Sequence, residues 1–259
     1  MTSLTTVSGD PLTIGIGTGT SIKDLKRGDP TPKNQSVIVD ILKYALNIGY
    51  NHIDTAEVYT TQPEVGMAIA GYPRQKLWIT TKYSVSSSMI KKKAFTPTDF
   101  IEQALEEMKT DYIDLFLIHF PPKQGDPYTI ESLWKEFISI KATGKVRYIG
   151  VSNFSIPQLQ KLFEATGVYP SVNQIQYYLG SPNSDVVQFC QQHGIHVEAY
   201  GPLTPLREPN TKADTLLEDS QNKSQELFRY LLSQNILPIT TSFKQSRLQE
   251  ALDTHNLIY

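Results

Sequence analysis

Cysteine is almost absent from this chain of 259 residues, in which Cys190 is the only one. A single cysteine excludes an internal disulfide and a zinc site made of several cysteines. Cys190 follows the apolar residues Val186, Val187 and Phe189. We therefore expect it to be a small core side chain rather than a reactive thiol.

Long hydrophobic runs are also missing. The most apolar stretches, such as residues 115–120, are far shorter than the roughly 20 residues that a membrane helix needs. Residues 1–14 contain neither the positively charged region nor the apolar region of a secretory signal. We expect a cytoplasmic protein with no membrane segment.

The chain has no excess charge of one sign. Lys and Arg number 24 against 26 Asp and Glu, which gives a net charge of −2. Proteins that bind nucleic acid usually carry a strong basic excess, so no nucleic-acid partner is expected. Apolar residues make up 39% of the sequence, enough for one large core, and we predict a single domain over residues 1–259.

Short apolar runs alternate with longer amphipathic segments along the whole chain. The alternation predicts about eight strand–helix units, and hence a single (β/α)8 TIM barrel of class α/β, with a doubly wound sheet as the alternative. An N-terminal β-hairpin is expected from residues 4–7 and a turn at 8–10. The predicted strands are residues 12–16, 52–54, 77–81, 113–119, 146–151, 172–175, 195–200 and 236–240, and the predicted helices are 37–46, 64–70, 96–108, 129–144, 155–163, 185–192, 226–232 and 246–252.

Polar residues stand at the ends of several predicted strands, where the active site of such a barrel lies. They are Asp54, Lys82, His119, Ser152, Asn153, Gln174 and Tyr200. Asp54 and Lys82 could pair across the barrel mouth. A Lys beside Tyr59 would lower the pKa of the phenol and make Tyr59 a proton donor. Taken alone, His119 fits a structural role equally well, and Tyr59 could merely cover a loop.

Several segments that carry these residues resemble the signatures of the aldo-keto reductases. Residues 49–59 read GYNHIDTAEVY, residues 117–121 read LIHFP, and residues 144–154 read GKVRYIGVSNF. The match continues with VNQI at 172–175 and EAYGPL at 198–203. Residues 17–20 (GTGT) and 237–242 (LPITTS) are most similar to the fungal branch of conjugated polyketone reductases and α-keto amide reductases.

The resemblance implies a catalytic tetrad of Asp54, Tyr59, Lys82 and His119. Its chemistry would be the reduction of α-dicarbonyl or α-keto compounds, ketones or aldehydes with NADPH. Tyr59 would protonate the carbonyl oxygen, with Lys82 held by Asp54 and His119 orienting the carbonyl. A small carbonyl compound is the implied partner, no metal is implied, and the branch is usually monomeric.

The resemblance also implies the residues that bind the cofactor. Ser152, Asn153 and Gln174 would bind the carboxamide, and Tyr200 would stack on the nicotinamide. The remaining positions are Gly17, Thr18 and Gly19 near the nicotinamide, Gly201, Pro202 and Leu203 at the start of a loop over the pyrophosphate, and Thr240, Thr241, Ser242, Lys244 and Arg247 around the 2′-phosphate. Residues 15–20 are not the G-x-G-x-x-G fingerprint, because position 20 is Thr and the residues after it do not predict a helix.

The sequence departs from the family pattern at several positions, among them Gly201, where the family has Ser. Ile239 stands where a Lys is common, and Arg247 falls about two residues late, yet Lys244 and Arg247 favour NADPH over NADH. Because the sequence ends at Tyr259, we expect the C-terminal tail that walls the substrate pocket in the family to be short or missing. The lysines at 91–93 are expected to form a solvated face.

Two other functions fit parts of the pattern. A cofactor-binding regulatory or sensor subunit would need the same nicotinamide site and show little turnover. A barrel aldolase or isomerase would use Lys82 as a Schiff-base amine, which leaves the nicotinamide-type positions without a purpose.

Overall fold

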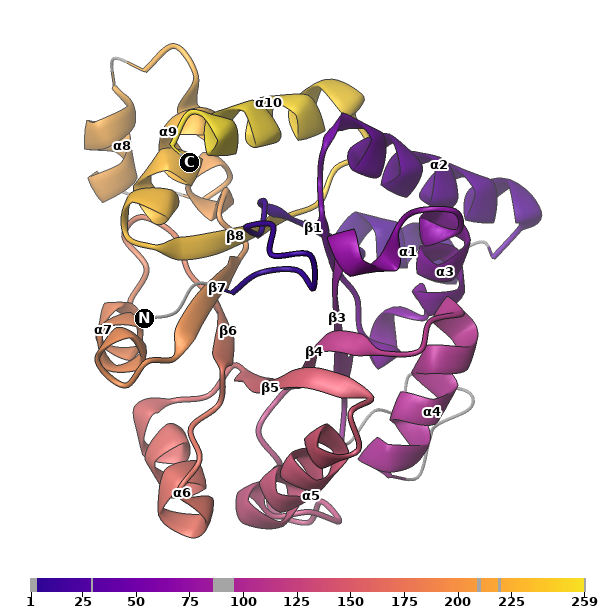
Figure 1. Cartoon of the computed structure of the whole chain (residues 1–259). Coiled ribbons are helices and arrows are strands. Elements are labelled where there is room, and N and C mark those ends of the chain that lie inside the picture. Colours follow the sequence, from indigo (N-terminus) through magenta and orange to yellow (C-terminus); the bar gives the residue numbers. More distant parts are fainter. Residues whose placement is uncertain (1–3, 29, 86–95, 209–210, 219, 259) are drawn as a thin grey trace.

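Eight parallel strands close into a barrel in chain order, with helices around the outside (Figure 1). The computed structural model describes residues 4–28, 30–85, 96–208, 211–218 and 220–258. The predicted (β/α)8 barrel is confirmed, and the doubly wound sheet is wrong because β1 pairs with β8. The strands are β1 (Gly15–Gly17), β2 (His52–Asp54), β3 (Trp78–Tyr83), β4 (Ile113–Ile118), β5 (Val146–Ser152), β6 (Val172–Gln176), β7 (His196–Tyr200) and β8 (Ile236–Thr240).

The helices begin and end largely where the sequence indicates. Thr96 caps its helix in a box with Asp99, and Ser155 does so with Gln158, which satisfies backbone N–H groups at both helix starts. Gly49 ends a helix in the left-handed region, at φ 116°. The helices are α1 (Thr20–Gly28), α2 (Pro32–Ile48), α3 (Gln62–Ile69), α4 (Pro97–Met108), α5 (Ile130–Ala142), α6 (Ile156–Thr166), α7 (Ser184–Gln192), α8 (Thr211–Leu217), α9 (Lys223–Ser233) and α10 (Gln245–Asn256), with 3-10 turns η1 (Glu57–Tyr59), η2 (Arg74–Lys76) and η3 (Thr204–Leu206).

Three local expectations need correction. The sequence predicts no helix after residues 15–20, yet α1 begins at Thr20. This helix contributes only Ile22 and, in part, Leu25 to the core, which are too few apolar residues to show the spacing typical of a helix. Residues 204–223, for which the sequence predicts no strand or helix, contain η3 and α8. The N-terminal hairpin is reduced to one antiparallel bridge, between Thr5 and Pro11. The lysines at 91–93 lie outside the described residues.

Most of the core lies inside the barrel and between barrel and helices, and a third, small cluster joins Ala213, Leu217 and Leu227. Alternate residues of each strand face opposite sides, so Phe116 and Ile118 pack in the large outer cluster while Leu115 and Leu117 belong to a small inner one with Trp78. Cys190 is fully buried, as expected.

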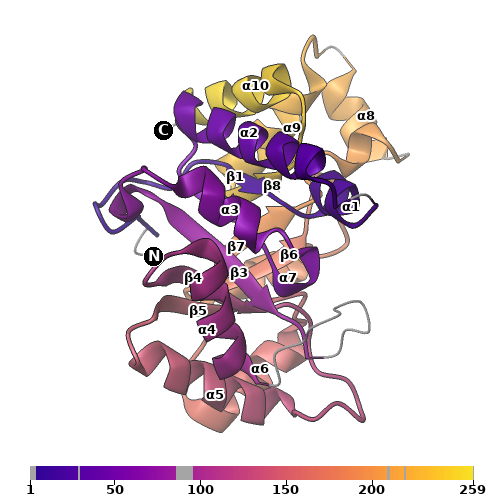
Figure 2. The same ribbon diagram turned by 90° about the vertical axis from the view of Figure 1, so that its right-hand side faces the viewer.

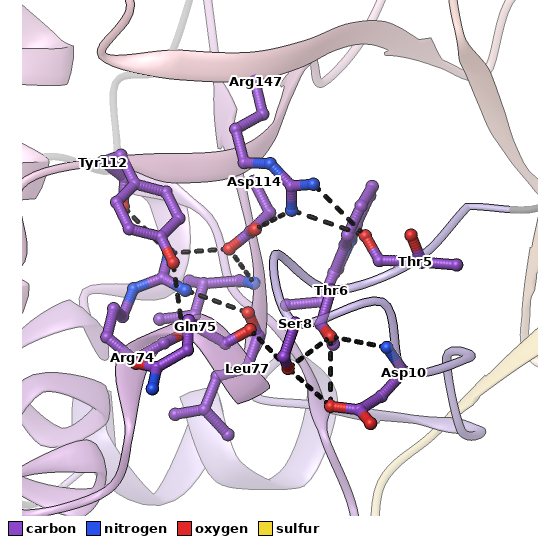
Figure 3. A network of polar contacts seen from close by, with 12 residues as sticks. Thr5, Thr6, Ser8, Asp10, Arg74, Gln75, Leu77, Tyr112, Asp114 and Arg147 are labelled. Atoms are coloured by element: carbon purple, nitrogen blue, oxygen red, sulfur yellow. Dashed lines mark hydrogen bonds and ion pairs between the residues drawn. The ribbon is translucent and has the colours of Figure 1, made fainter.

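The N-terminal end of the barrel is closed by the chain's first described residues, which lie at the end opposite α1 (Figure 2). Figure 3 shows the polar network that attaches them. Ser8 donates its backbone N–H to Gln75 O (3.0 Å), and Arg147 reaches Thr5 O (3.4 Å). Asp114 is at the centre of this network.

Asp114 is fully buried and accepts from two arginines. Arg74 Nη2 and Arg147 Nη1 each lie 2.6 Å from a carboxylate oxygen, and Ile79 N lies 3.0 Å away. A buried carboxylate is tolerated only with such pairing, and loss of its charge leaves two guanidinium groups short of a partner.

We therefore expect Asp114→Asn to lower the free energy of unfolding by about 3 kcal/mol. The measurement is urea denaturation. Glu102→Gln is the control, because it breaks the exposed pair with Lys145 and should cost less than about 1 kcal/mol. Equal, small losses in both variants would show that the network does not hold this end of the barrel.

Candidate active site

A cavity of about 970 Å³ opens at the carboxyl ends of the strands. Its walls come from strand ends that are far apart in the sequence but adjacent in the barrel. Most of the residues predicted for the site line it: Gly17, Gly19, Asp54, Tyr59, His119, Ser152, Asn153, Gln174, Tyr200, Gly201, Pro202, Leu203, Thr240 and Thr241.

A buried ion pair lies beneath the cavity. Lys82 Nζ, fully buried, is 2.5 Å from Asp54 Oδ1 and donates a second hydrogen bond to Thr55 O at 3.0 Å. Burial by itself lowers the pKa of the ammonium, but Asp54 and Tyr59 raise it more, and the net pKa of Lys82 lies above its usual value. Lys82 is therefore a fixed positive charge. The predicted pairing of Asp54 with Lys82 is confirmed.

Tyr59 lies at the end of η1, directly after β2, with its ring over Lys82. The ring centroid is 5.0 Å from Lys82 Nζ and 5.6 Å from the ring of His119, in an edge arrangement. Burial raises the pKa of the Tyr59 phenol and the Lys82 charge lowers it, with a net pKa above the usual value. The expected net lowering is wrong, because desolvation outweighs the ammonium. Tyr59 thus keeps its proton at neutral pH.

His119 follows β4 and is neutral. Its Nδ1 lies 3.3 Å from Ser84 Oγ, and its ring stacks on Phe120 with centroids 4.7 Å apart. Burial, the Lys82 charge and the Lys23 charge together hold the pKa of this imidazole well below its usual value. A neutral imidazole can orient a polar group by a hydrogen bond without adding charge.

Another wall of the cavity is formed by side chains of β5, β6 and β7 and the residue after β5, which hydrogen bonds link to one another. Ser152 Oγ donates to Gln174 O at 2.8 Å, and Asn153 Nδ2 donates to His119 O at 3.0 Å. Tyr200 donates its hydroxyl to Asn153 Oδ1 at 2.7 Å. These bonds fix the side chains that the sequence placed around a nicotinamide ring.

Two glycines let the backbone of the first loop approach the site closely. A Cβ added to Gly19 would lie 3.1 Å from Tyr59 Cζ, and one added to Gly17 would lie 3.0 Å from Ile239 Cγ2. Thr18 does not line the cavity: it is buried, and its Oγ1 donates to Asp54 O at 3.2 Å and accepts from Thr61.

Three of the residues expected around a 2′-phosphate lie beyond the cavity wall. Ser242, Lys244 and Arg247 are at the start of α10, with Lys244 at the cap and Arg247 in the first turn. Ser242 Oγ accepts from Lys244 N at 3.0 Å. Within the described residues, neither Lys244 nor Arg247 forms an ion pair with a carboxylate. A helix N-terminus with two cations favours an anion.

Several cavity residues escaped the sequence analysis. Lys23 and Arg27 come from α1, Phe120 and Lys123 from the loop after β4, and Arg207 from the residue after η3. The first two were missed with α1 itself. Phe120 could have been found from the sequence, because an aromatic residue directly after a strand-end histidine indicates a residue that lines the site. Among the described residues, no group of His, Cys, Asp or Glu could hold a metal ion, and no helix is long and apolar enough to cross a membrane.

The sequence matches the aldo/keto reductase family over residues 13–228, a span that includes all four tetrad positions. The chain belongs to the aldo/keto reductase family. The family match and the barrel geometry agree, because the strand-end residues of the signatures are those that meet around the cavity.

Two fungal relatives are similar over most of their length. The chain is 37% identical to an NADPH-dependent alpha-keto amide reductase of Saccharomyces cerevisiae, over 91% of this chain and 79% of that protein. It is 36% identical to an NAD/NADP-dependent indole-3-acetaldehyde reductase of Schizosaccharomyces pombe, over 92% and 84%. Among solved structures, a Bombyx mori aldo-keto reductase in complex with NADP superposes with a TM-score of 0.77 at 27% identity, over 98% of this chain and 87% of that one.

Proposed function

We propose that this aldo/keto reductase is an NADPH-dependent carbonyl reductase that converts α-dicarbonyl or α-keto compounds, ketones or aldehydes to alcohols, with Tyr59 as the proton donor. The observation that carries the proposal is the Lys82–Asp54 pair beneath the Tyr59 ring, at the base of a cavity large enough for a cofactor and a small substrate. The named activities of the fungal relatives support the same chemistry.

The residues present fit a nicotinamide cofactor. The side chains of Ser152, Asn153 and Gln174 offer amide and hydroxyl groups on one wall, and the Tyr200 ring is next to them. Residues 201–203 border the cavity beyond β7, and Lys244 and Arg247 at the start of α10 suit a 2′-phosphate. NADPH, when bound, supplies the hydride.

The chain's own residues donate the proton to the carbonyl oxygen and stabilise the negative charge that forms. As negative charge grows on the carbonyl oxygen, Tyr59 donates its hydroxyl proton to it. The phenolate left on Tyr59 is stabilised by the Lys82 ammonium, which the buried Asp54 carboxylate already holds beneath the Tyr59 ring. His119, neutral, hydrogen-bonds the carbonyl and so orients it.

The other two functions have less support. A Schiff base requires an unprotonated amine, whereas Lys82 is paired with Asp54 and its pKa is raised. No observation on the described residues favours a sensor role with little turnover.

The proposal further includes one barrel domain over residues 1–259 that acts as a cytoplasmic monomer without nucleic acid. Its support is the balanced charge and the single cysteine.

We expect Tyr59→Phe to lower kcat for a small α-diketone by about 10²–10⁴-fold, because the donor is lost while the ring and its packing stay. NADPH oxidation followed by absorbance measures this, and fluorescence titration should give an unchanged NADPH Kd. Tyr200→Phe is the matched control: it removes a phenol that bonds Asn153, not one over Lys82, and should keep most of the turnover. Full turnover in Tyr59→Phe would contradict the assignment.

We also expect the variant Lys244→Ala/Arg247→Ala to weaken NADPH binding by about tenfold or more, since two cations near a phosphate are removed. The Kd for NADH should stay within about twofold, because NADH has no 2′-phosphate. Fluorescence titration with both cofactors makes the comparison. Equal weakening for the two would place the phosphate elsewhere, with the cavity cations Lys23 and Arg207 as the next candidates.

A further inference from the structure

A second buried carboxyl group lies behind the tetrad. Glu198, on β7, is 1% exposed and pairs in register with Gln174 on β6. Gln174 Nε2 donates to Asp54 Oδ2 at 2.8 Å and to Glu198 Oε2 at 2.7 Å. A single amide therefore joins the carboxyl group that holds Lys82 to a carboxyl group outside the tetrad.

The cluster contains more potential negative charge than positive. Asp54 and Glu198 are two carboxyls, and Lys82 is the nearby cation, paired directly with Asp54 and acting on Glu198 only through its charge. Glu198 Oε1 has no hydrogen-bond partner among the described residues and lies 3.8 Å from His52 Nε2. His52 does not compensate: burial first, and Lys82 as well, lower the pKa of its imidazole to about 4 although Asp54 raises it.

The groups around Glu198 come from several elements. Asp54 and His52 face it from β2 and Lys82 from β3, while its register partners on β6 and β8 are Gln174 and Leu237, which do not titrate. On β7 itself, the titratable neighbours are His196 and Tyr200, two residues to either side.

Burial, and next the charge of Asp54, raise the pKa of Glu198 to about 7, although the Gln174 hydrogen bond and Lys82 lower it. A group in this state changes charge near neutral pH.

We propose that Glu198 is a positioning residue of this site: it holds Asp54 through the Gln174 amide, and its protonation sets the net charge beside Lys82 and Tyr59. The inference rests on the proposed reductase function. While Glu198 is protonated, Asp54 alone balances Lys82, and the ammonium can stabilise the Tyr59 phenolate. Ionised Glu198 adds a second negative charge, which binds the Lys82 proton more tightly and opposes formation of the phenolate.

Two measurable consequences follow. Proton donation by Tyr59 becomes harder as Glu198 ionises, so kcat for carbonyl reduction falls severalfold as pH rises through about 7. The folded state also binds the Glu198 proton more tightly than the unfolded chain, whose pKa is near the ordinary 4.5. The stability that protonated Glu198 contributes is therefore fully present below pH 4.5, the pKa of an ordinary glutamate, and is lost as pH rises through about 7, its pKa in the folded state.

The test is Glu198→Gln, which keeps the size of the side chain and an acceptor for Gln174 Nε2 but cannot ionise. We measure kcat for a small α-diketone with saturating NADPH, and Tm, from about pH 5.5 to about pH 8.5. We expect the wild type to lose activity with a midpoint near pH 7 and the variant to lack this step. The Tm of the variant relative to wild type should rise with pH.

The control is Glu64→Gln, another fully buried glutamate, which pairs with Lys26 and Gln35 and should keep the wild-type pH profile. An unchanged pH profile in Glu198→Gln would overturn the proposal, and so would a uniform loss of activity with a lower Tm at every pH. If the wild type has no turnover, the proposed function fails instead. The pH dependence of the Tm difference then still decides whether Glu198 titrates, and a constant difference overturns the inference.

Discussion

The ion pair between Lys82 and Asp54 is the interaction on which the site depends. Both groups are buried, so neither could remain charged without the other. Their pairing fixes a positive charge beneath the Tyr59 ring, and Gln174 extends the contact across the barrel to Glu198. Tyr59, the Gln174 amide and the interior carboxyl group of Glu198 thus share one electrostatic environment rather than acting as separate residues.

The barrel makes this arrangement possible because its amino end is closed by a structural ion-pair network, whereas its carboxyl end opens into the cavity. At the amino end, Asp114 between Arg74 and Arg147 closes the structure with the N-terminal segment over it. The small apolar cluster around Trp78 fills the interior next to that end. At the carboxyl end, strands distant in sequence place their last residues, many of them polar, around one cavity.

The barrel and the meeting of polar strand-end residues around one cavity could be predicted from the sequence because both leave local signals: apolar runs at regular intervals and polar residues at strand ends. The catalytic roles of Asp54, Tyr59, Lys82 and His119 are implied by the family resemblance and stay a prediction. The net pKa of Tyr59 could not, since it depends on how far burial outweighs the Lys82 charge. Helix α1 went unrecognised because it gives the core little beyond Ile22, and Lys23 was missed with it. Glu198 did carry a local signal, because it is an acidic residue between the apolar residues Val197 and Ala199 in the middle of β7.

The most direct test of the account is a double-mutant cycle between Lys82 and Tyr59. Single-turnover rates of α-diketone reduction are compared for Lys82→Met, Tyr59→Phe and the double variant, each saturated with NADPH. If Lys82 acts by stabilising the Tyr59 phenolate, the double variant is no slower than the slower single variant, because residues that act as a unit give strongly non-additive losses. Losses that multiply would show that Lys82 and Tyr59 contribute independently, and would contradict the account.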